Sequence, residues 1–237
     1  AARVVGFEAV QSLPLVALLD SDDHWPVDFL ERTAEKLAAT PDAAAISVDR
    51  YYVETTGSSR QATDCSRLAA DPIRWFFENG AGVASCTLCR TSAVAAVGGW
   101  KPELQAAEDA ELFCRLALTG RWLHAPGESV KFHLGNAAQR AEENNLSRRW
   151  ADSQLRWVHV YEAIYQHVVE RGATRNLRRL HAALALRWSS AGRQLLRLGD
   201  AAQARTCYRR ALHYNPRHLR TWRRLVAAGI PKLLAEK

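Results

Sequence analysis

Two acidic segments of the chain carry residues whose type and spacing suit catalysis. Asp20-Ser21-Asp22-Asp23 follows the apolar run of residues 15–19, and Glu108-Asp109 opens a helix-like stretch. Two carboxylates two residues apart can flank a divalent ion bound to a diphosphate, because Mg²⁺ and Mn²⁺ take hard oxygen ligands. A carboxylate in the first turn of a helix is stabilised as the anion. Asp109 therefore suits a general base only if burial or a neighbouring negative group raises its pKa again.

Each of these residues also has an ordinary structural explanation. Asp22 or Asp23 would cap the helix that begins near Pro26, and Glu108-Asp109 would be a common acidic first turn. His133, taken alone, is more often a structural histidine than a metal ligand. No single one of these signals is specific, and only their order along the chain distinguishes between the two explanations.

The elements that must position these residues alternate between strand and helix. Strands are expected at 15–19, 43–53 and 83–90, and helices at 26–40, 71–78, 92–97 and 108–119. This alternation predicts an α/β layer structure with a mostly parallel sheet. An acidic turn directly after a buried strand would then lie at the carboxyl edge of the sheet, where open α/β sheets bind ligands.

Beyond about residue 145 the sequence shows only helix-like stretches and no strand-like ones. Helices are expected at 150–170, 176–198, 201–214 and 217–228. Small and aromatic residues within about 185–218 match the spacing of one tetratricopeptide-like repeat. Because one repeat cannot form a stable solenoid, we expect it to pack on neighbouring structure. We therefore predict an α/β domain over 1–144 and a helical region over 145–237.

Charge divides the chain in a similar way. Residues 151–237 hold 17 Lys and Arg against 5 Asp and Glu, a net charge of +12. Subtraction from the totals of 32 and 25 leaves 15 against 20 in residues 1–150, a net charge of −5. The overall charge of +7 is thus an average over an acidic and a basic part, which indicates that the two parts have different partners.

The last expected helix is amphipathic and basic. Apolar residues with Trp222 among them form one face, and Arg220, Arg223 and Arg224 lie on the other. Such a helix could lie on an anionic membrane surface. Alternatively, it packs its apolar face on the repeat and solvates its arginines. No recognised nucleic-acid motif accompanies the arginines, so nucleic acid is not an expected partner.

Composition excludes several classes of protein. With 48% hydrophobic residues, 24% charged residues, 13 Gly and 8 Pro, the chain is neither collagen-like nor low-complexity. Its five scattered cysteines favour a reducing, cytoplasmic location, with peripheral membrane contact as an option. Cys86 and Cys89 have metal-site spacing, but on the expected strand they would point to opposite faces, so we expect core thiols.

Six motifs occur in an order that resembles the family 2 glycosyltransferases of the GT-A fold, over about residues 1–137. The motifs are Arg3-x-x-Gly6, Asp20-Ser21-Asp22-Asp23 with Trp25-Pro26, Gly80-Ala81-Gly82, Val97-Gly98-Gly99-Trp100, Glu108-Asp109-Ala110-Glu111-Leu112, and Phe132-His133-x-Gly135-Asn136. The resemblance implies an enzyme that moves a sugar from a nucleotide-diphosphate sugar to a hydroxyl acceptor with inversion. The acceptor would be a carbohydrate or a lipid-linked molecule, in surface polysaccharide or glycolipid assembly.

The resemblance also implies roles for individual residues. Asp22 would contact Mn²⁺ or Mg²⁺, His133 would complete the metal and diphosphate site, and Asp109 would be the general base. The donor-binding residues would be Asp20, nearer the ribose, together with Arg3, Asp23, Gly80 and Gly82. Glu108 and Trp100 would support the site.

The resemblance is incomplete at its start. The family's domain normally begins with two strand–helix units of about 30 residues each, and the acidic turn here lies only 20 residues into a sequence without methionine. We therefore expect an N-terminally truncated domain, which alone binds nucleotide sugars poorly and could itself be inactive. The alternative is a non-catalytic interaction or scaffold protein that docks a partner through its helical region.

Overall fold

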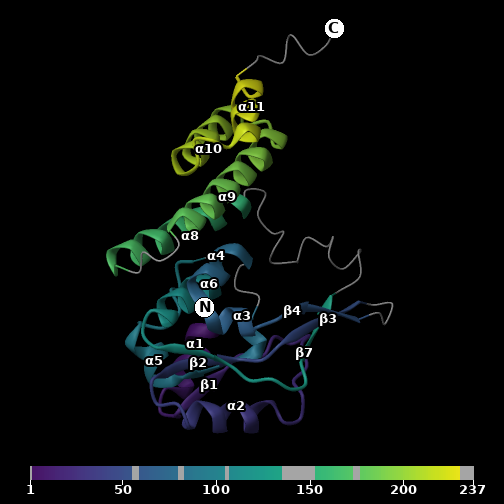
Figure 1. Ribbon diagram of the computed structural model, residues 1–237, viewed down its shortest axis with the longest axis vertical. Helices are drawn as coiled ribbons and strands as arrows, with labels where there is room; N and C mark the ends of the chain where they lie inside the picture. The colour runs from purple at the N-terminus through teal and green to yellow at the C-terminus, as the bar shows by residue number, and fades with distance from the viewer. Residues whose placement is uncertain are drawn as a thin grey trace. The chain divides into compact units, whose positions relative to one another are not determined.

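The computed structural model describes residues 2–54, 59–79, 83–104, 107–134, 153–172 and 177–229. The chain divides into two compact units, residues 1–142 and 143–237. The elements of the first unit, labelled as in Figure 1, are α1 Ala2–Val10, β1 Leu15–Ala17, α2 Phe29–Ala38, β2 Ala43–Ser47, β3 Arg50–Glu54, β4 Ser59–Thr63, α3 Ser66–Ala70, α4 Pro72–Asn79, a 3₁₀ turn Ala84–Cys86, β5 Thr87–Arg90, α5 Thr91–Ala96, α6 Glu108–Ala117, β6 Arg121–His124 and β7 Val130–Leu134.

The strands form two sheets. The larger has the order β1-β5-β2-β6, and the smaller has the order β4-β3-β7. Pairs β2–β6 and β3–β7 are parallel, whereas β1–β5, β2–β5 and β3–β4 are antiparallel. An α/β unit followed by helices is confirmed, but the sheets are mixed and not mostly parallel. The sequence could not show this, because a strand covered on both faces has the same continuous apolar pattern in either direction.

Two expected strands differ from the structure. The stretch 43–53 is divided at Val48-Asp49 into β2 and β3, which belong to different sheets. The stretch 83–90 begins with the 3₁₀ turn, which places Cys86 off the strand, and both Cys86 and Cys89 are buried and free. Helix α1 was not expected, because its segment has too weak an apolar periodicity to predict one.

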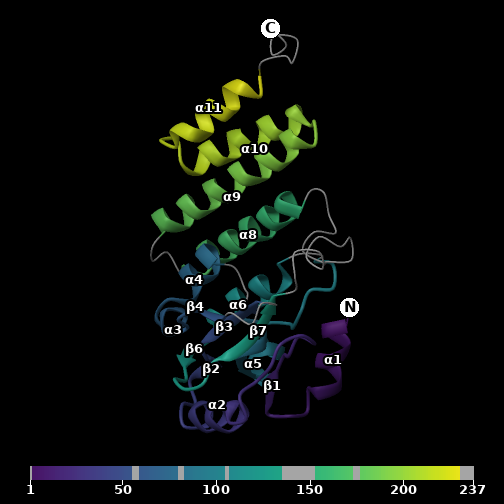
Figure 2. The ribbon, with the colours of Figure 1, turned by 90° about the vertical axis from the view of Figure 1, so that its right-hand side faces the viewer.

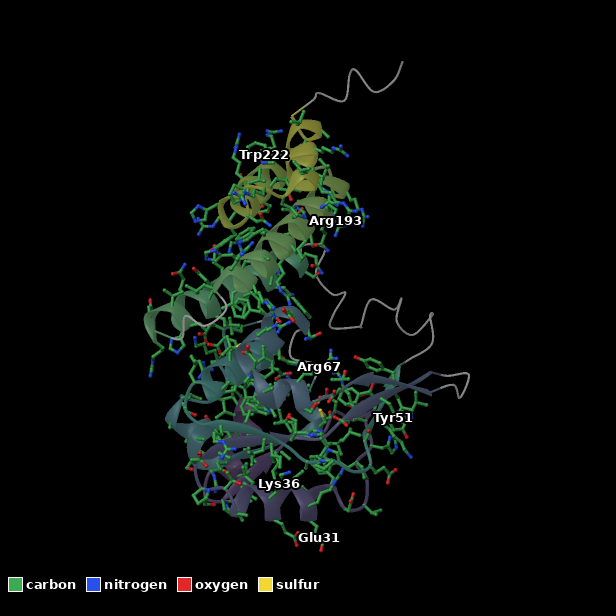
Figure 3. All side chains as sticks on the ribbon, in the orientation of Figure 1. Glu31, Lys36, Tyr51, Arg67, Arg193 and Trp222 are labelled. Carbon is green, nitrogen blue, oxygen red and sulfur yellow. The ribbon has the colours of Figure 1, made fainter. Side chains whose placement is uncertain are left out.

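Helices cover both faces of the larger sheet (Figure 1). Helix α2 packs on β2 and β5, burying Phe29 and Leu37 completely, while Glu31 and Lys36 project to solvent (Figure 3). Helices α3 and α6 lie against β6 and β2. An aromatic cluster of Phe76, Phe113 and Trp122, with ring centroids 5.3–5.9 Å apart, fixes α4 and α6 to the sheet. The N-terminus of α6 is thereby held in place for the site described below.

The second unit is helical. Its elements are α8 Ser153–Glu170, α9 Leu177–Arg197, α10 Ala201–Tyr214 and α11 Leu219–Ala227. Helix α9 packs between α8 and α10, and α11 follows on α10 (Figure 2). Asp200 caps α10 by accepting a hydrogen bond from the backbone N–H of Gln203. The expected helices thus exist within a few residues of their bounds; that α9 and α10 form a tetratricopeptide-like repeat stays a prediction.

Membrane-spanning segments were searched among the described helices. None of them combines the length and the apolar character that crossing a bilayer requires.

Candidate active site

The acidic turn after β1 is held together by one serine. The backbone N–H of Asp23 donates to the carbonyl of Asp20 at 3.0 Å, closing the turn. The hydroxyl of Ser85, which is fully buried, accepts from the backbone N–H of Asp20 at 3.1 Å and donates to the carboxylate of Asp23. The indole N–H of Trp25 donates to the Ser85 carbonyl at 2.6 Å. Ser85 thus fixes both ends of the turn.

The turn concentrates negative charge. Burial raises the pKa of Asp23, the hydrogen bond from Ser85 opposes this, and the charges of Asp22 and Asp20 raise the pKa further. Asp22 and Asp20 remain exposed. A cation beside the turn would relieve this repulsion.

Arg3 joins the turn to the N-terminus of α6. Its Nη1 donates to Glu108 and to Asp109, each at 2.7 Å, and its Nη2 donates to Asp20 at 3.2 Å. Burial opposes the charge of Arg3, but the charges of Asp109, Asp20 and Glu108 outweigh burial and raise its pKa. One guanidinium therefore gathers three carboxylates from two segments of the chain, and we call this group the Arg3 cluster.

Asp109 is the most enclosed carboxylate of the Arg3 cluster. Its side chain is 16% exposed, against 34% for Glu108 and 49% for Asp20. Burial raises the pKa of Asp109, the charge of Arg3 opposes this, and the charge of Glu108 adds to the rise. The indole N–H of Trp100 donates to the same Oδ1 that Arg3 contacts, at 3.2 Å. The condition for a general base, a pKa raised by burial and a negative neighbour, is therefore met.

The backbone turns sharply into α6 directly before these carboxylates. Ala107 has φ 54° and ψ 23°, a left-handed conformation that disfavours an alanine by about 1–2 kcal/mol. The helix then begins at Glu108, so both carboxylates lie in its first turn beside the positive end of the helix dipole. The strained conformation of Ala107 thus directs the chain into the helix turn that holds Glu108 and Asp109.

Helix α1 carries Arg3 to the cluster. Phe7, one helical turn beyond Arg3, is buried and meets the ring of Trp100 edge to face at a centroid distance of 5.8 Å. A Cβ on Gly99 would lie 3.5 Å from the Phe7 ring, so the chain passes close to α1 there. Trp100 therefore contacts α1 through its ring and Asp109 through its nitrogen.

His133 lies beside the acidic turn. Its Nδ1 is 2.8 Å from the carbonyl oxygen of Asp22 and 3.2 Å from Nδ1 of His24, and the two rings meet edge to face. A carbonyl oxygen only accepts, so Nδ1 of His133 carries the proton in this arrangement. Nε2 of the neutral ring is then an acceptor, and no described residue bonds to it. Mutual backbone hydrogen bonds between His24 and Lys131 of β7 fix this contact.

The donor set fits a metal ion held partly by substrate. Among the residues that the structure describes, no three His, Cys, Asp or Glu side chains form a group that could hold an ion. The exposed carboxylate of Asp22 and the Nε2 of His133 are two suitable ligands on adjoining segments. Magnesium is commonly bound by one or two carboxylates with the other ligands from phosphates and water. The residues present therefore fit such an ion.

A pocket of about 440 Å³ lies between α1 and β1. Arg3, Asp20 and Trp100 contribute to its lining, and most of the remaining lining is apolar. The pocket therefore adjoins the Arg3 cluster and offers room for part of a ligand.

The structure brings together most of the residues predicted from sequence. Asp20, Arg3, Glu108, Asp109 and Trp100 form one connected group. A second group joins Asp22, Asp23 and His133 through backbone and serine contacts. Gly80 and Gly82 lie outside the described residues.

Sequence reasoning missed Ser85 and His24. Ser85 is an ordinary buried serine between two apolar residues, and nothing in its spacing relates it to a turn 65 positions earlier. His24 directly follows the acidic turn, and this adjacency is the signal that could have found it.

Comparison with known proteins gives the family. The model of the glycosyl transferase family group 2 matches residues 15–231, and the chain therefore belongs to this family. The match extends over both compact units. No curated protein matches the chain.

One solved structure similar to this chain is the mannosyltransferase PcManGT from Pyrobaculum calidifontis, in complex with GDP-Man and Mn²⁺. The two chains are 15% identical with a TM-score of 0.41, and the match covers 97% of this chain and 66% of the mannosyltransferase. This chain thus spans less than two thirds of that protein, and the likeness supports no conclusion about substrate.

Proposed function

We propose that the chain is the catalytic part of an inverting, metal-dependent glycosyltransferase of the GT-A fold. The substrates would be a nucleotide-diphosphate sugar and a hydroxyl acceptor. The observation that carries the proposal is Asp109, an enclosed carboxylate with a raised pKa in the same cluster as Asp20 of the acidic turn. Membership of the glycosyl transferase family supports this class of reaction.

Asp109 has one oxygen to spare for the reaction. Arg3 and Trp100 both bond to Oδ1, and no described residue bonds to Oδ2. In the proposed reaction Oδ2 accepts the proton of the acceptor hydroxyl. The acceptor oxygen then bonds to the anomeric carbon as the bond from that carbon to the diphosphate oxygen breaks. Direct displacement by one acceptor inverts the anomeric configuration.

The acidic turn supports the donor side of the reaction. Asp22 and His133 would hold Mn²⁺ or Mg²⁺, which when bound acts as a Lewis acid that neutralises the departing diphosphate. We assign Asp20 and Asp23 to donor binding, with Asp20 nearer the ribose. Arg3 would contribute from the pocket between α1 and β1, which its side chain helps to line.

A paired substitution tests Asp109. In the full-length protein, Asp109→Asn should lower turnover about 10²–10⁴-fold while leaving donor affinity within about threefold. Glu108→Gln, which removes a charge bonded to the same Arg3 nitrogen, should lower turnover at least tenfold less. The assay is a donor screen that includes GDP-mannose, with Mn²⁺ or Mg²⁺. Unchanged turnover in Asp109→Asn would refute its role as base.

We further propose a carbohydrate or lipid-linked acceptor, in surface polysaccharide or glycolipid assembly, and a cytoplasmic protein that contacts membranes peripherally. On α11 the side chains of Leu219, Trp222 and Val226 are 73%, 47% and 65% exposed, whereas Thr221 is buried. This exposed apolar face supports contact with an anionic membrane more than packing on the repeat. Co-sedimentation with anionic vesicles that is no greater than with neutral ones would contradict the membrane contact.

A further inference from the structure

Helices α9 and α11 meet through a small polar network. Nη1 of Arg224 donates to the hydroxyl of Ser189 at 2.8 Å, and the hydroxyl of Thr221 donates to the same oxygen at 3.0 Å. Ser189 and Thr221 are buried. Nδ1 of His218 lies 2.6 Å from the Thr221 hydroxyl and completes the network. The side chain of Arg224 on α11 is therefore held toward α9.

A second guanidinium lies beside the first. Arg193 is one helical turn beyond Ser189 on α9, and its Nη2 donates to the hydroxyl of Ser190 at 3.0 Å (Figure 3). Burial and then the positive charge of Arg193 lower the pKa of Arg224, with Arg220 adding to the effect. The two guanidinium groups are thus close enough to repel each other.

No carboxylate compensates these charges in the part of the chain that the structure describes. Neither Arg193 nor Arg224 contacts Asp or Glu there, and both instead donate to neutral serine hydroxyls. Residues 177–229 contain twelve arginines, no lysine and one acidic residue, Asp200. Paired guanidinium groups without a carboxylate commonly recognise phosphate oxygens.

Tyr208 supplies an independent sign of a ligand. Its side chain is fully buried, and its hydroxyl has no hydrogen-bond partner among the described residues. A Cβ on Gly192 would lie 2.6 Å from Cε1 of Tyr208, so the ring packs on the turn of α9 that leads into Arg193. Burial raises the pKa of Tyr208, while the nearby charges of Arg224 and Arg193 oppose the rise. A buried, unsatisfied donor thus belongs to a ring that packs on Gly192, the residue directly before Arg193.

We propose that Arg193, Arg224 and the Tyr208 hydroxyl form a binding site for a phosphate group, supplied by a soluble phosphate compound or by the headgroup of an anionic lipid. Two guanidinium groups balance the double negative charge of a phosphate monoester. The Tyr208 hydroxyl, which is buried and has no partner among the described residues, donates to a phosphate oxygen when the anion is bound. The site lies within the helical unit and does not depend on the transferase reaction.

Calorimetric titration of the full chain with inorganic phosphate, at ionic strength matched with sodium chloride, tests the site. Arg193→Gln should weaken phosphate binding at least tenfold, because a charge-assisted pair is lost. Tyr208→Phe should weaken it about threefold without lowering thermal stability, because the hydroxyl that it removes is unsatisfied. Arg178→Gln is the matched control, with the same charge change on α9 about 22 Å away, and should weaken binding less than twofold.

Vesicles distinguish the two sources of phosphate. Retention on phosphatidic acid vesicles over phosphatidylcholine vesicles, lost in Arg193→Gln and kept in Arg178→Gln, assigns the site to a lipid headgroup. Phosphate binding that depends on Arg193, without vesicle retention, assigns it to a soluble compound. Equal weakening by Arg193→Gln and Arg178→Gln, or no binding of either probe, overturns the proposal, since general positive charge would explain everything observed.

Discussion

Asp109 keeps a negative charge in a place where burial opposes it. Because its pKa is raised above the ordinary value of 3.8, protonated Asp109 is favoured in the folded state relative to the unfolded state. The stability contributed by its protonation is complete below pH 3.8 and is lost as the pH rises through the raised pKa. At neutral pH the ionised carboxylate of Asp109 therefore lowers the stability of the fold.

We predict that Asp109→Asn is more thermostable than the wild type above the raised pKa, and that the difference shrinks toward pH 4. Thermal unfolding at a series of pH values measures this. Asp42→Asn, which removes an exposed carboxylate paired with Arg121 at 3.7 Å, serves as the control and should show little pH-dependent difference. A difference for Asp109→Asn that is constant with pH would contradict the prediction.

Ser85 is the residue on which the acidic turn depends. Ser85→Ala removes the acceptor of the Asp20 N–H and the donor to Asp23, so we expect a loss of about 1–3 kcal/mol in the free energy of unfolding. The pKa of Asp23 should also rise, because the bond from Ser85 lowers it. Urea denaturation and NMR titration of the carboxyl carbons measure the two effects. Ser21→Ala, at an exposed position of the same turn, should change stability by less than about 0.5 kcal/mol.

At the scale of elements, two helical glycines should respond oppositely to alanine. A Cβ on Gly192 would lie 2.6 and 2.9 Å from the Tyr208 ring and 3.1 Å from the carbonyl of Ala204, whereas a Cβ on Gly6 of α1 meets nothing within 4 Å. We predict that Gly192→Ala destabilises the protein by about 1–3 kcal/mol through overpacking. Gly6→Ala should stabilise it by about 0.5–1 kcal/mol through helix propensity. Chemical denaturation measures both changes in the free energy of unfolding. A change in the same direction for the two variants would contradict the packing explanation.

The sequence predicted which stretches form helices where the apolar periodicity was strong. It did not predict the directions in which neighbouring strands run. The apolar spacing of Leu112, Phe113 and Leu116 defined α6 to within two residues of its end. The uniform burial of β2 gave no sign that its neighbour β5 runs antiparallel or that the chain changes sheets at Val48-Asp49. These features depend on pairing between distant segments, which local periodicity does not contain.

The candidate site was predictable as a set of acidic and histidine residues but not as a geometry. The ordered motifs named Asp20, Asp109 and Arg3, yet nothing in their types shows that one guanidinium joins both carboxylates. Ser85 and His24 were missed because they act through contacts that only the folded chain creates.

At the scale of the whole molecule, charge imbalance predicts a response to salt. Residues 177–229 carry a net charge of +11, from twelve arginines and one aspartate, so the helical unit repels itself. Raising sodium chloride from about 0.01 M to about 0.15 M shortens the Debye length from about 30 Å to about 8 Å. We expect a stabilisation of about 1 kcal/mol, equivalent to about 4–8 °C for a unit of this size.

Far-ultraviolet circular dichroism during heating measures this response. The double substitution Arg178→Gln and Arg179→Gln, at two exposed positions of α9, should reduce the dependence on salt by lowering the charge. A midpoint that does not change with salt would show that the arginines are already compensated.

The contacts of Arg3 also bear on the order in which the protein forms. Its bonds to Glu108 and Asp109 link residues 105 and 106 positions apart. During synthesis, the ribosome must release nearly the whole first unit before these charges can meet. Closing so long a loop slows assembly and is opposed by chain entropy, which the packing of Phe7 on Trp100 helps to offset. The Arg3 cluster would therefore be among the last features to appear in a folding chain, and a nascent or partly unfolded protein would carry these acidic residues without the arginine that gathers them.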